Sequence, residues 1–296
     1  MRNKILLCVV ILLLPISIYV VKNKSDEVKL EDNKEIMVSL SYNNENLLLS
    51  LDDYLVGVVG AEMPASFNME ALMAQAIASR TFLLSKGISE IIKTNSLEQA
   101  YKTLDELKSK WNDKYDDYLN KIRLAVSSTD NLVMMYQGNI IKSYYFAISN
   151  GYTEDCLPVF NEEYPYIDIV DSSFDKEVKN YLVEVEFEKL DFCKKLEIDC
   201  SGIVINNVLY DDSKRVDKIT INNKEFSGVQ VRKLLGLRST DFSIEVGDNI
   251  KISTRGYGHG VGMSQYGANY LANQNYSYEE ILKYYYKDIE IKNYLV

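Results

Sequence analysis

The sequence is poor in the residues that build metal centres and disulfide frameworks. Its 296 residues include a single histidine, His259, and four cysteines. Cys8 lies in an apolar run at the N-terminus, so only Cys156, Cys193 and Cys200 follow it. A zinc site needs more ligands than one histidine and scattered cysteines supply, and we expect no metal and no cofactor. The last two cysteines are close enough to bridge, but three cysteines make no disulfide framework, and structural thiols are the favoured interpretation.

The sequence also lacks a basic patch. Its formal net charge is −10, from 33 lysines and arginines against 43 aspartates and glutamates. This balance argues against a nucleic-acid partner. It would also repel an anionic polymer at long range, so a bound glycan would be held by hydrogen bonds and stacking. The 23 tyrosines suit that role, although most of them fit ordinary strand and core positions.

An apolar run over residues 5–21, flanked by basic residues, opens the chain. Its length is near the lower limit for a spanning helix, and no small residues mark a cleavage site after it. We therefore predict a signal anchor or transmembrane helix over residues 1–22, a short polar linker over 23–34 and one extracytoplasmic domain over 35–296. The predicted location is the cell membrane, crossed once. A cleaved signal peptide is the alternative.

A buried helix is predicted over residues 71–84, because almost every position there is apolar or small. The exceptions are Gln75, Ser79 and Arg80. Gln75 and Ser79 lie one turn apart on one helix face, and Arg80 is beside them. A buried helix with one polar stripe usually aims it at a site or at a buried hydrogen-bond network.

Glu62 stands just before this helix, between an apolar run and Met63-Pro64. Pro64 favours extended geometry at Met63, so we expect a strand-like end that turns into the helix. Apolar neighbours should partly desolvate the carboxylate, and desolvation raises a carboxyl pKa, which suits a general acid. The competing interpretation is structural: Glu62 caps backbone amides or pairs with Arg80. Residue type alone favours that second interpretation, because structural carboxylates far outnumber catalytic ones.

The rest of the chain alternates between hairpin-like and helical segments. Residues 35–51 and 132–148 alternate in hydropathy around turn sequences, which predicts two hairpins. Residues 96–126 carry apolar side chains at helical spacing, which predicts helices. Further strands are predicted at 164–173, 180–187, 215–221 and 249–253, and short helices at 52–55, 193–200 and 227–237. The predicted fold class is α+β, with antiparallel β hairpins packed around the buried central helix and a helical lobe, preceded by one N-terminal transmembrane helix.

Two turns are rich in groups that can approach a ligand. Residues 149–155 crowd hydrogen-bonding side chains together, and residues 256–262 alternate glycine with other residues. The alternating glycines predict a backbone loop rather than a strand. This loop lacks the lysine and spacing of a phosphate loop and the pattern of a dinucleotide site, so close approach of the backbone to an extended ligand fits better. A plain turn is the alternative for both stretches.

Three stretches together resemble one family. They are Ala61–Phe67 with Ala74–Thr81, Ser149–Glu154, and Gly256–Ala268. In order and spacing they are similar to the stage II sporulation protein D family, whose relatives include amidase enhancer proteins of the cell wall. The last stretch is long and very specific. Residues 231–239 also fit, and the likeness runs from about residue 36 to the C-terminus.

The resemblance implies a membrane-anchored lytic transglycosylase that cleaves peptidoglycan strands, preferably stripped of stem peptides, between MurNAc and GlcNAc to leave 1,6-anhydro-MurNAc ends. Such enzymes degrade septal wall and act in forespore engulfment during sporulation. The implied partners are the glycan strands, a membrane-anchored amidase/endopeptidase and a multi-spanning membrane protein of the engulfment complex. By matching position, Glu62 is the expected catalytic acid. The residues expected to bind substrate are Gln75, Arg80, Ser149, Tyr152, Glu154, Tyr257, His259, Ser264, Gln265 and Tyr266.

One carboxyl group suffices for this chemistry. Glycoside hydrolysis commonly uses two carboxyl groups, whereas in a lytic transglycosylase the C6 hydroxyl of muramic acid attacks the anomeric carbon. A single group can protonate the leaving oxygen and then accept the hydroxyl proton, and Glu62 in an apolar setting fits both tasks.

The sequence departs from the family at two places. Where some family members carry histidines, this chain has Phe146-Ala147-Ile148 and Lys283-Tyr284, so no role of those histidines is carried over. A non-catalytic glycan-binding amidase enhancer subunit is the alternative function. A scaffold with vestigial grooves is a weaker third.

Overall fold

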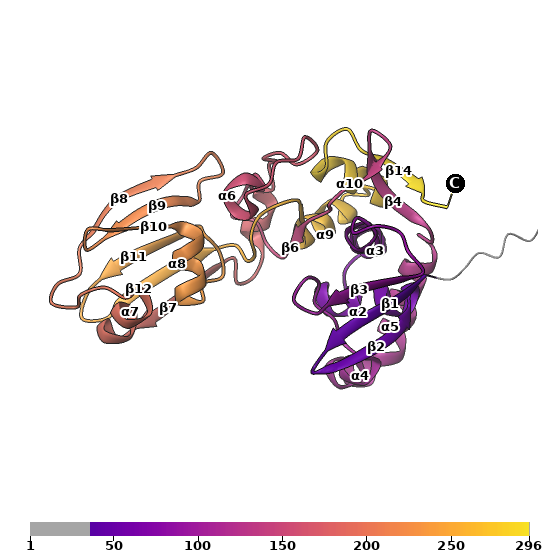
Figure 1. The fold of residues 1–296 in the computed structure, drawn as a ribbon, viewed down its shortest axis with the longest axis horizontal. Helices are drawn as coiled ribbons and strands as arrows, with labels where there is room; N and C mark the ends of the chain where they lie inside the picture. Colours follow the sequence, from indigo (N-terminus) through magenta and orange to yellow (C-terminus); the bar gives the residue numbers. More distant parts are fainter. Residues whose placement is uncertain (1–35, 296) are drawn as a thin grey trace, which may run out of the picture. The chain divides into compact units, whose positions relative to one another are not determined.

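The computed structural model describes residues 36–295, so the predicted membrane helix and linker lie outside the described residues. Within residues 36–295, no helix combines the length and the apolar character needed to cross a membrane. The described chain is a mixed α+β fold of short helices and several small sheets (Figure 1). The helices are α2 (Leu51–Glu62), α3 (Met69–Leu84), α4 (Leu104–Trp111), α5 (Tyr115–Ser127), α6 (Leu157–Phe160), α7 (Lys189–Leu196), α8 (Gly228–Leu235), α9 (Gln265–Asn273) and α10 (Tyr278–Tyr285), with 3-10 helices η1 (Asn112–Lys114) and η2 (Ser173–Glu177). The strands are β1 (Met37–Tyr42), β2 (Glu45–Ser50), β3 (Ile91–Asn95), β4 (Leu132–Tyr136), β5 (Asn139–Ile140), β6 (Tyr145–Phe146), β7 (Leu182–Phe187), β8 (Ile205–Tyr210), β9 (Val216–Ile221), β10 (Lys224–Ser227), β11 (Phe242–Val246), β12 (Ile250–Arg255), β13 (Met263–Ser264) and β14 (Glu290–Asn293).

The predicted buried helix is α3, and it is the centre of the first hydrophobic core. The oxygen Oδ1 of Asn68 accepts a hydrogen bond from the Glu70 amide at 3.1 Å and so caps its first turn. The helix contacts α2, α5, α9 and α10. A helix that is apolar on nearly all sides needs such partners all round, so the expectation of a buried central helix is confirmed.

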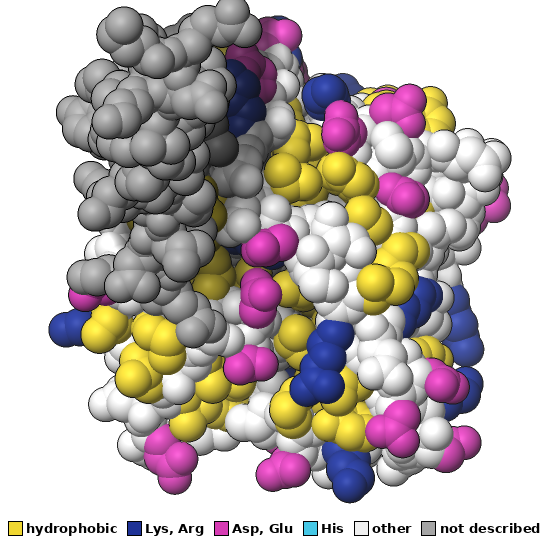
Figure 2. Space-filling model, turned by 90° about the vertical axis from the view of Figure 1, so that its right-hand side faces the viewer, with side chains coloured by type: hydrophobic (Ala, Val, Ile, Leu, Met, Phe, Trp, Pro, Cys, Tyr) yellow, Lys and Arg dark blue, Asp and Glu magenta, His cyan; other side chains and the backbone are white. Residues whose placement is uncertain are grey.

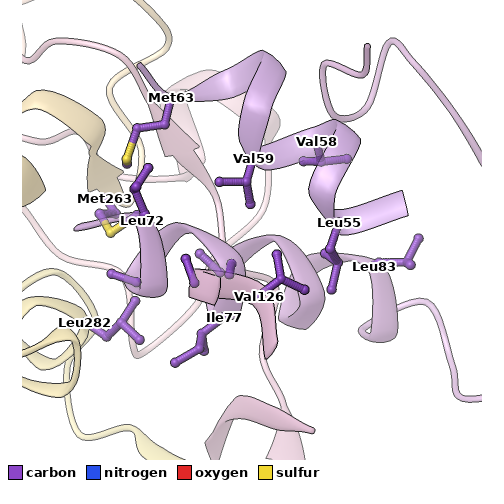
Figure 3. Packing of buried hydrophobic residues seen from close by; sticks show 14 of the residues in the cluster. Leu55, Val58, Val59, Met63, Leu72, Ile77, Leu83, Val126, Met263 and Leu282 are labelled. Carbon is purple, nitrogen blue, oxygen red and sulfur yellow. The ribbon is translucent and has the colours of Figure 1, made fainter. Parts of the chain in front are cut away.

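Apolar side chains from sequence-distant elements fill this first core. Figure 3 shows side chains of one cluster that come from both α2, such as Val59, and α3, such as Leu72 and Ile77. Leu282 of α10 packs into the same cluster. Burial of each such side chain contributes roughly 1.5–3 kcal/mol before the entropy cost of folding is subtracted. This core therefore holds α2, and with it Glu62, against the central helix.

The first predicted hairpin is confirmed and the second is shorter than predicted. Strands β1 and β2 pair antiparallel around Asn43 and Asn44, which have φ of 48° and 65°, as a two-residue hairpin turn requires. Strand β3 adds to β1 in parallel. Strand β4 pairs with β5 over only two residue pairs, and β6 instead pairs in parallel with β13.

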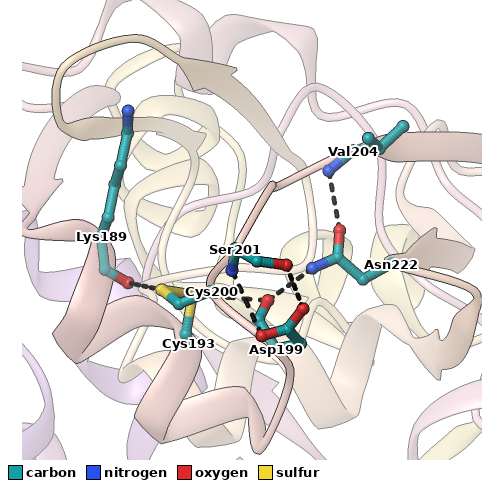
Figure 4. The surroundings of a disulfide bond; sticks show 7 residues. All are labelled: Lys189, Cys193, Asp199, Cys200, Ser201, Val204 and Asn222. Atoms are coloured by element: carbon teal, nitrogen blue, oxygen red, sulfur yellow. Dashed lines mark hydrogen bonds between the residues drawn. A yellow bond between two sulfur atoms is a disulfide. The ribbon is translucent and has the colours of Figure 1, made fainter.

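A second hydrophobic core lies among β7 to β12, α7 and α8. It is bounded by two three-stranded antiparallel sheets, of order β10-β9-β8 and β11-β12-β7. The structure joins Cys193 of α7 to Cys200 in a disulfide, where free thiols had been favoured (Figure 4). In the described chain Cys156 alone is a free cysteine, and it is buried.

Three local predictions are wrong. Residues 164–173 form no strand: the Ile167 amide bonds to the Tyr164 carbonyl at 3.0 Å in a turn, and Asp171 makes only an isolated bridge to Tyr152. Residues 96–103 precede the helix rather than belong to it, because Thr103 and Glu106 form a capping box that starts α4. Glu62 ends a helix rather than a strand, although Met63 is extended as expected.

Candidate active site

Glu62 is the last residue of α2, and its side chain is partly exposed. The helix stops there because Pro64 favours the extended backbone seen at Met63, with φ −118° and ψ 140°. Oε1 of Glu62 accepts a hydrogen bond from the Ala100 amide at 2.7 Å. Oε2 accepts one from Nε2 of Gln265 at 3.3 Å. Two fixed donors therefore hold the carboxyl group in one orientation.

Burial raises the pKa of Glu62 above its ordinary value. The hydrogen bonds from Ala100 and Gln265 and the charge of Lys110 act in the opposite direction, and burial outweighs them. Lys110 is held nearby because its Nζ donates to the Gly60 carbonyl at 3.0 Å. The result is a carboxyl group that retains its proton at higher pH than usual, as a general acid must.

The polar stripe of α3 forms a hydrogen-bond network that ends at Glu62. Nε2 of Gln265 also donates to Oε1 of Gln75 at 3.3 Å, and Nε2 of Gln75 donates to Oγ of Ser79 at 3.0 Å. Gln75 and Ser79 are fully buried. The side-chain amide group of Gln75 donates to Ser79, so its carbonyl oxygen faces Gln265. Gln265 must therefore direct its amide hydrogens, and not its oxygen, toward Gln75 and Glu62. The predicted stripe thus acts as a buried network behind the carboxyl group.

Two hollows meet at Glu62. One, which we call the aromatic hollow, has a volume of about 590 Å³ and is lined by Tyr144, Tyr145, Phe160, His259 and the loop 96–100 as well as Glu62. The other, the lysine hollow, has about 360 Å³ and is lined by Glu62, Lys110, Lys179, Tyr257 and Gln265, among others. A carboxyl group between two hollows can reach a bond in the middle of an extended ligand.

A third hollow continues from both of these. This arginine hollow, of about 600 Å³, is lined by Arg232, Lys233 and Arg238, and also by Phe160, Tyr257 and His259. It shares Phe160 and His259 with the aromatic hollow, and Arg238 and Tyr257 with the lysine hollow. Two side chains of the glycine loop 256–262, Tyr257 and His259, therefore line the hollows, as expected if an extended ligand lies against this loop.

The glycine loop needs its glycines for conformation and for space. All four have positive φ, from 77° to 120°. A Cβ at Gly262 would lie 2.0 Å from the Tyr144 carbonyl oxygen, and one at Gly256 would lie 2.7 Å from that of Ile148. No side chain fits at such distances. The loop thereby presents Tyr257, which is 49% exposed, and His259 to the hollows.

His259 is a neutral hydrogen-bonding group at the hollows. Its Nδ1 accepts a hydrogen bond from the Val261 amide at 3.0 Å, which places its proton on Nε2. Burial, with the charges of Arg232 and Arg215, lowers the pKa of His259 to about 3. Its ring also packs edge-on against Phe160, with centroids 5.1 Å apart.

Several predicted ligand contacts have structural partners instead. Arg80 is fully buried and donates to the carbonyls of Thr129 and Val126 at 2.7 and 3.2 Å, which ties α3 to the end of α5. Arg80, Ser149, Tyr152, Glu154 and Ser264 line none of the three hollows. The predicted residues that do line them are Glu62, Tyr257, His259, Gln265 and Tyr266.

Ser264 and Glu154 support the site from behind, whereas Tyr152 is exposed. Oγ of Ser264 donates to Oδ2 of Asp175 at 2.6 Å and accepts from the Gly267 amide, as the cap of α9. Glu154 and Arg215 form a buried ion pair at 3.7 Å beneath the glycine loop. Burial raises the pKa of Glu154 to about 7 against the opposing charge of Arg215.

Sequence reasoning missed the loop 96–103 and the cations of the hollows. Ala100 contributes only a backbone N–H to Glu62, which no residue type reveals. Lys110, Lys179, Arg232, Lys233 and Arg238 come from separate segments. These five cations do not form a continuous basic run in the sequence. The lack of such a run therefore does not exclude hollows lined by basic residues in the folded protein. The family-like stretch 231–239 was the one available signal.

The family model described as "Stage II sporulation protein" matches residues 43–136. Stage II sporulation protein D of Bacillus subtilis is 38% identical over 255 residues, which cover 82% of this chain and 74% of that protein. The protein of that name from Bacillus amyloliquefaciens is 37% identical over the same shares. The amidase enhancer of Bacillus subtilis is 28% identical over 81% of this chain and 40% of its own length.

Proposed function

The chain belongs to the stage II sporulation protein D family, and we propose that it is a peptidoglycan lytic transglycosylase acting in septal wall degradation and forespore engulfment. The observation that carries this proposal is Glu62, a rigidly held carboxyl group of raised pKa where two hollows meet. Its substrate is the glycan strand, cut between MurNAc and GlcNAc.

In the proposed reaction Glu62 serves first as acid and then as base. Its proton passes to the glycosidic oxygen as the bond from that oxygen to the anomeric carbon breaks. The C6 hydroxyl oxygen of the same muramic acid then bonds to the anomeric carbon, and its proton returns to Glu62. No water is consumed, and the product carries a 1,6-anhydro ring. Gln265 and Ala100 stabilise the carboxylate that exists between the two transfers.

The second carboxyl group at the aromatic hollow supports this route over hydrolysis. Glu98 lines the hollow, but its Oε2 pairs with Lys86 and accepts from Thr94 Oγ1 at 3.2 Å, and its Oε1 accepts from Asn95 at 3.1 Å. A base that activates water must be free to accept its proton. Glu98 is tied to Lys86 by an ion pair, whereas none of the ion pairs among the described residues includes Glu62, so we assign both proton transfers to Glu62 alone.

We also propose the cellular setting that the family implies. The chain would be anchored in the cell membrane through residues 1–22, with residues 35–296 outside. It would work beside a membrane-anchored amidase/endopeptidase, which strips the stem peptides, and a multi-spanning membrane protein. The second candidate function is a non-catalytic glycan-binding enhancer of an amidase, which the similarity to the Bacillus subtilis amidase enhancer favours.

The test is product analysis with the full chain in detergent. Peptide-free glycan strands are incubated with wild-type protein, Glu62→Gln and the control Glu245→Gln, which removes an exposed carboxylate of β11 that lines none of the hollows. We expect anhydro-muramyl ends from wild type and control, and at least about a hundredfold slower cleavage by Glu62→Gln, because general acid catalysis is lost. Strand binding should persist in that variant.

Other products would contradict the proposal. Reducing ends would indicate a hydrolase that uses water and a second carboxyl group. Binding without cleavage by the wild-type protein would favour the enhancer.

A further inference from the structure

The charges that face Glu62 differ between the two hollows that it lines. The lysine hollow is lined by three cations, Lys110, Lys179 and Arg238. Among the described residues, no lysine or arginine lines the aromatic hollow, where Glu98 is the second acidic group. Acidic and basic side chains are interspersed on the described part of the face in Figure 2. The separation of charge across Glu62 is therefore a local feature of these hollows.

The cations of the lysine hollow retain hydrogens for a ligand. Within residues 36–295, no carboxylate oxygen lies within 4.0 Å of any of the three. Nζ of Lys110 donates to the carbonyls of Gly60 and Ala61 at 3.0 and 3.5 Å, and an ammonium group has three hydrogens. An Nη1 of Arg238 donates to the Asn180 carbonyl at 3.1 Å, which leaves most of its five donors. The remaining hydrogens can bind the oxygen atoms of a sugar.

Rings replace cations at the aromatic hollow, whose lining includes Phe82, Tyr144, Tyr145, Phe160 and His259. Burial, above all, lowers the pKa of His259 to about 3, so this ring is neutral as well. Lys86 approaches this lining but is paired with Glu98. Lys142, which lies over the Tyr144 ring, is paired with Glu162 at 2.8 Å. The negative faces of aromatic rings attract cations, so this hollow can accommodate a positive charge that the lysine hollow would repel.

The two sugars at the cleaved bond differ in the charge that they develop. The transition state of glycosidic cleavage resembles an oxocarbenium ion, with positive charge on the ring oxygen and the anomeric carbon of one sugar. In the proposed reaction that sugar is muramic acid. The leaving GlcNAc takes the proton of Glu62 on its oxygen and departs neutral. Cations close to the muramic acid would raise the barrier, whereas next to the leaving sugar they can donate hydrogen bonds to its hydroxyl groups.

We propose that the glycan strand crosses Glu62 in one direction, with the muramic acid that receives the anhydro ring in the aromatic hollow and the leaving GlcNAc in the lysine hollow. This inference rests on the proposed function, because it requires the glycan strand as ligand and cleavage at Glu62. The anomeric carbon of the muramic acid is joined to the leaving sugar, so the non-reducing end of the strand lies toward the loop 96–100. The reducing end lies toward Lys179.

The experiment determines the direction from the reaction rates of introduced thiols. A tetrasaccharide of alternating GlcNAc and MurNAc, which contains one MurNAc–GlcNAc bond, carries a maleimide at either its reducing or its non-reducing end. The full chain in detergent carries Glu62→Gln to prevent cleavage, together with Leu97→Cys at the aromatic hollow or Lys179→Cys at the lysine hollow. Both side chains are exposed, so neither change removes a buried contact. The control is Lys195→Cys, at an exposed position of α7 that lines none of the three hollows.

We expect the reducing-end maleimide to react at least about tenfold faster with Lys179→Cys than with Lys195→Cys, because a bound strand raises the local concentration of the maleimide. The non-reducing-end maleimide should show the same preference for Leu97→Cys. An excess of unlabelled tetrasaccharide should abolish both preferences.

Two results would overturn the inferred direction and leave the proposed function intact: the opposite pairing of maleimides and thiols, or equal rates of each maleimide at Leu97→Cys and Lys179→Cys. Rates no higher than those of Lys195→Cys would also overturn it, because the strand would then contact neither hollow. Only if the wild-type protein also forms no anhydro-muramyl ends from peptide-free strands would the proposed function fail with it.

Discussion

At the scale of single residues, the acidity of Glu62 is set by opposing influences. Burial raises its pKa, and the donors from Ala100 and Gln265 lower it. The amide hydrogen of Ala100 could be removed only by proline, which would also restrain the loop backbone, whereas the side chain of Gln265 can be replaced directly. Its orientation is fixed by Gln75, so it acts as a positioning residue that stabilises the ionised form of Glu62.

Replacement of Gln265 by methionine should raise the pKa of Glu62, because a donor to the carboxylate is lost while burial remains. A general acid is active when protonated, so the alkaline limb of the kcat/KM–pH profile should move to higher pH. At its optimum the variant should be slower by about tenfold or more, since the ionised intermediate state loses a charge-assisted hydrogen bond. The measurement is anhydro-product formation against pH.

Gln274→Met provides the control, because Gln274 is exposed at the end of the same helix. Its profile should match that of wild type. An unchanged alkaline limb in Gln265→Met would show that Gln265 does not set the acidity of Glu62, whatever the loss in rate.

The sequence predicts the chemical centre of this site better than its lining. Apolar neighbours predict that Glu62 is desolvated, but its choice as the catalytic acid depends on the family resemblance. Gln75 could be chosen because a polar group on a buried helix needs a partner. Arg80 follows the same rule, but its partners are backbone carbonyls at the end of α5 and just after it, which carry no sequence signal. Arg238 and Lys110 could not be brought together at all, since their proximity depends on tertiary packing.

At the scale of elements, Gly57 and Gly60 of α2 set how closely this helix approaches the loop 96–103 and α4, respectively. A Cβ at Gly57 would lie 2.2 Å from Cε2 of Tyr101 and 2.8 Å from the Lys102 carbonyl oxygen. The Lys102 amide also bonds to the Gly57 carbonyl at 3.3 Å. Since Ala100 directly precedes Tyr101, the position of its N–H depends on this contact.

Gly57→Ala should therefore damage both stability and activity. Alanine favours the helix by up to about 1 kcal/mol, but overpacking against Tyr101 and a backbone carbonyl costs about 1–3 kcal/mol or more. We expect a lower free energy of unfolding and weaker cleavage, because the Ala100 amide moves away from Glu62. Denaturant unfolding, followed through the fluorescence of Trp111, the single tryptophan, measures the first effect.

Gly202→Ala is the matched control, since a Cβ there meets nothing within 4 Å. It should leave both quantities near wild type. Full activity in Gly57→Ala would mean that the loop tolerates displacement, and that its amide is dispensable to Glu62.

The elements most accurately predicted are those with a strong local pattern. The Asn43-Asn44 turn between alternating strands and the apolar run of α3 each determine their structure locally. The same Asn-Asn signal at residues 222–223, with φ of 49° and 64°, joins β9 to β10 and was overlooked. Strand β6 could not be predicted from the sequence. It consists of two residues, and its pairing with β13 depends on where the glycine loop lies in the folded protein.

At the scale of the whole molecule, one buried carboxyl group ties together three segments that are far apart in sequence. Oδ2 of Asp175 accepts hydrogen bonds from the Ser149 amide at 2.7 Å and from Oγ of Ser264 at 2.6 Å, while its Oδ1 has no partner. Ser149 belongs to the predicted ligand turn, and Ser264 caps α9, which carries Gln265. Two motifs of the family thus meet at Asp175 and serve the architecture of the site.

This arrangement predicts how stability depends on pH. Burial raises the pKa of Asp175 from 3.8 to about 6. The folded state therefore holds a proton that the unfolded state releases, and the associated stability is present below about pH 4 and is lost as pH rises to about 6. The loss is up to about 3 kcal/mol. Asp175→Asn cannot titrate, so the stability of the wild-type protein relative to this variant should fall over that interval.

Chemical unfolding of both proteins at closely spaced pH values between 4 and 8 checks this dependence. Asp171→Asn, an exposed neighbour whose Oδ1 accepts from Ser173, should follow the wild-type curve across the interval. If Asp175→Asn also follows it, then Asp175 does not bind its proton more tightly in the folded state, and its ties to Ser149 and Ser264 are those of an ionised carboxylate. If the free energy of unfolding falls between pH 4 and 6 only in the proteins that retain Asp175, then protonated Asp175 stabilises the contacts to Ser149 and Ser264 more than the ionised form does.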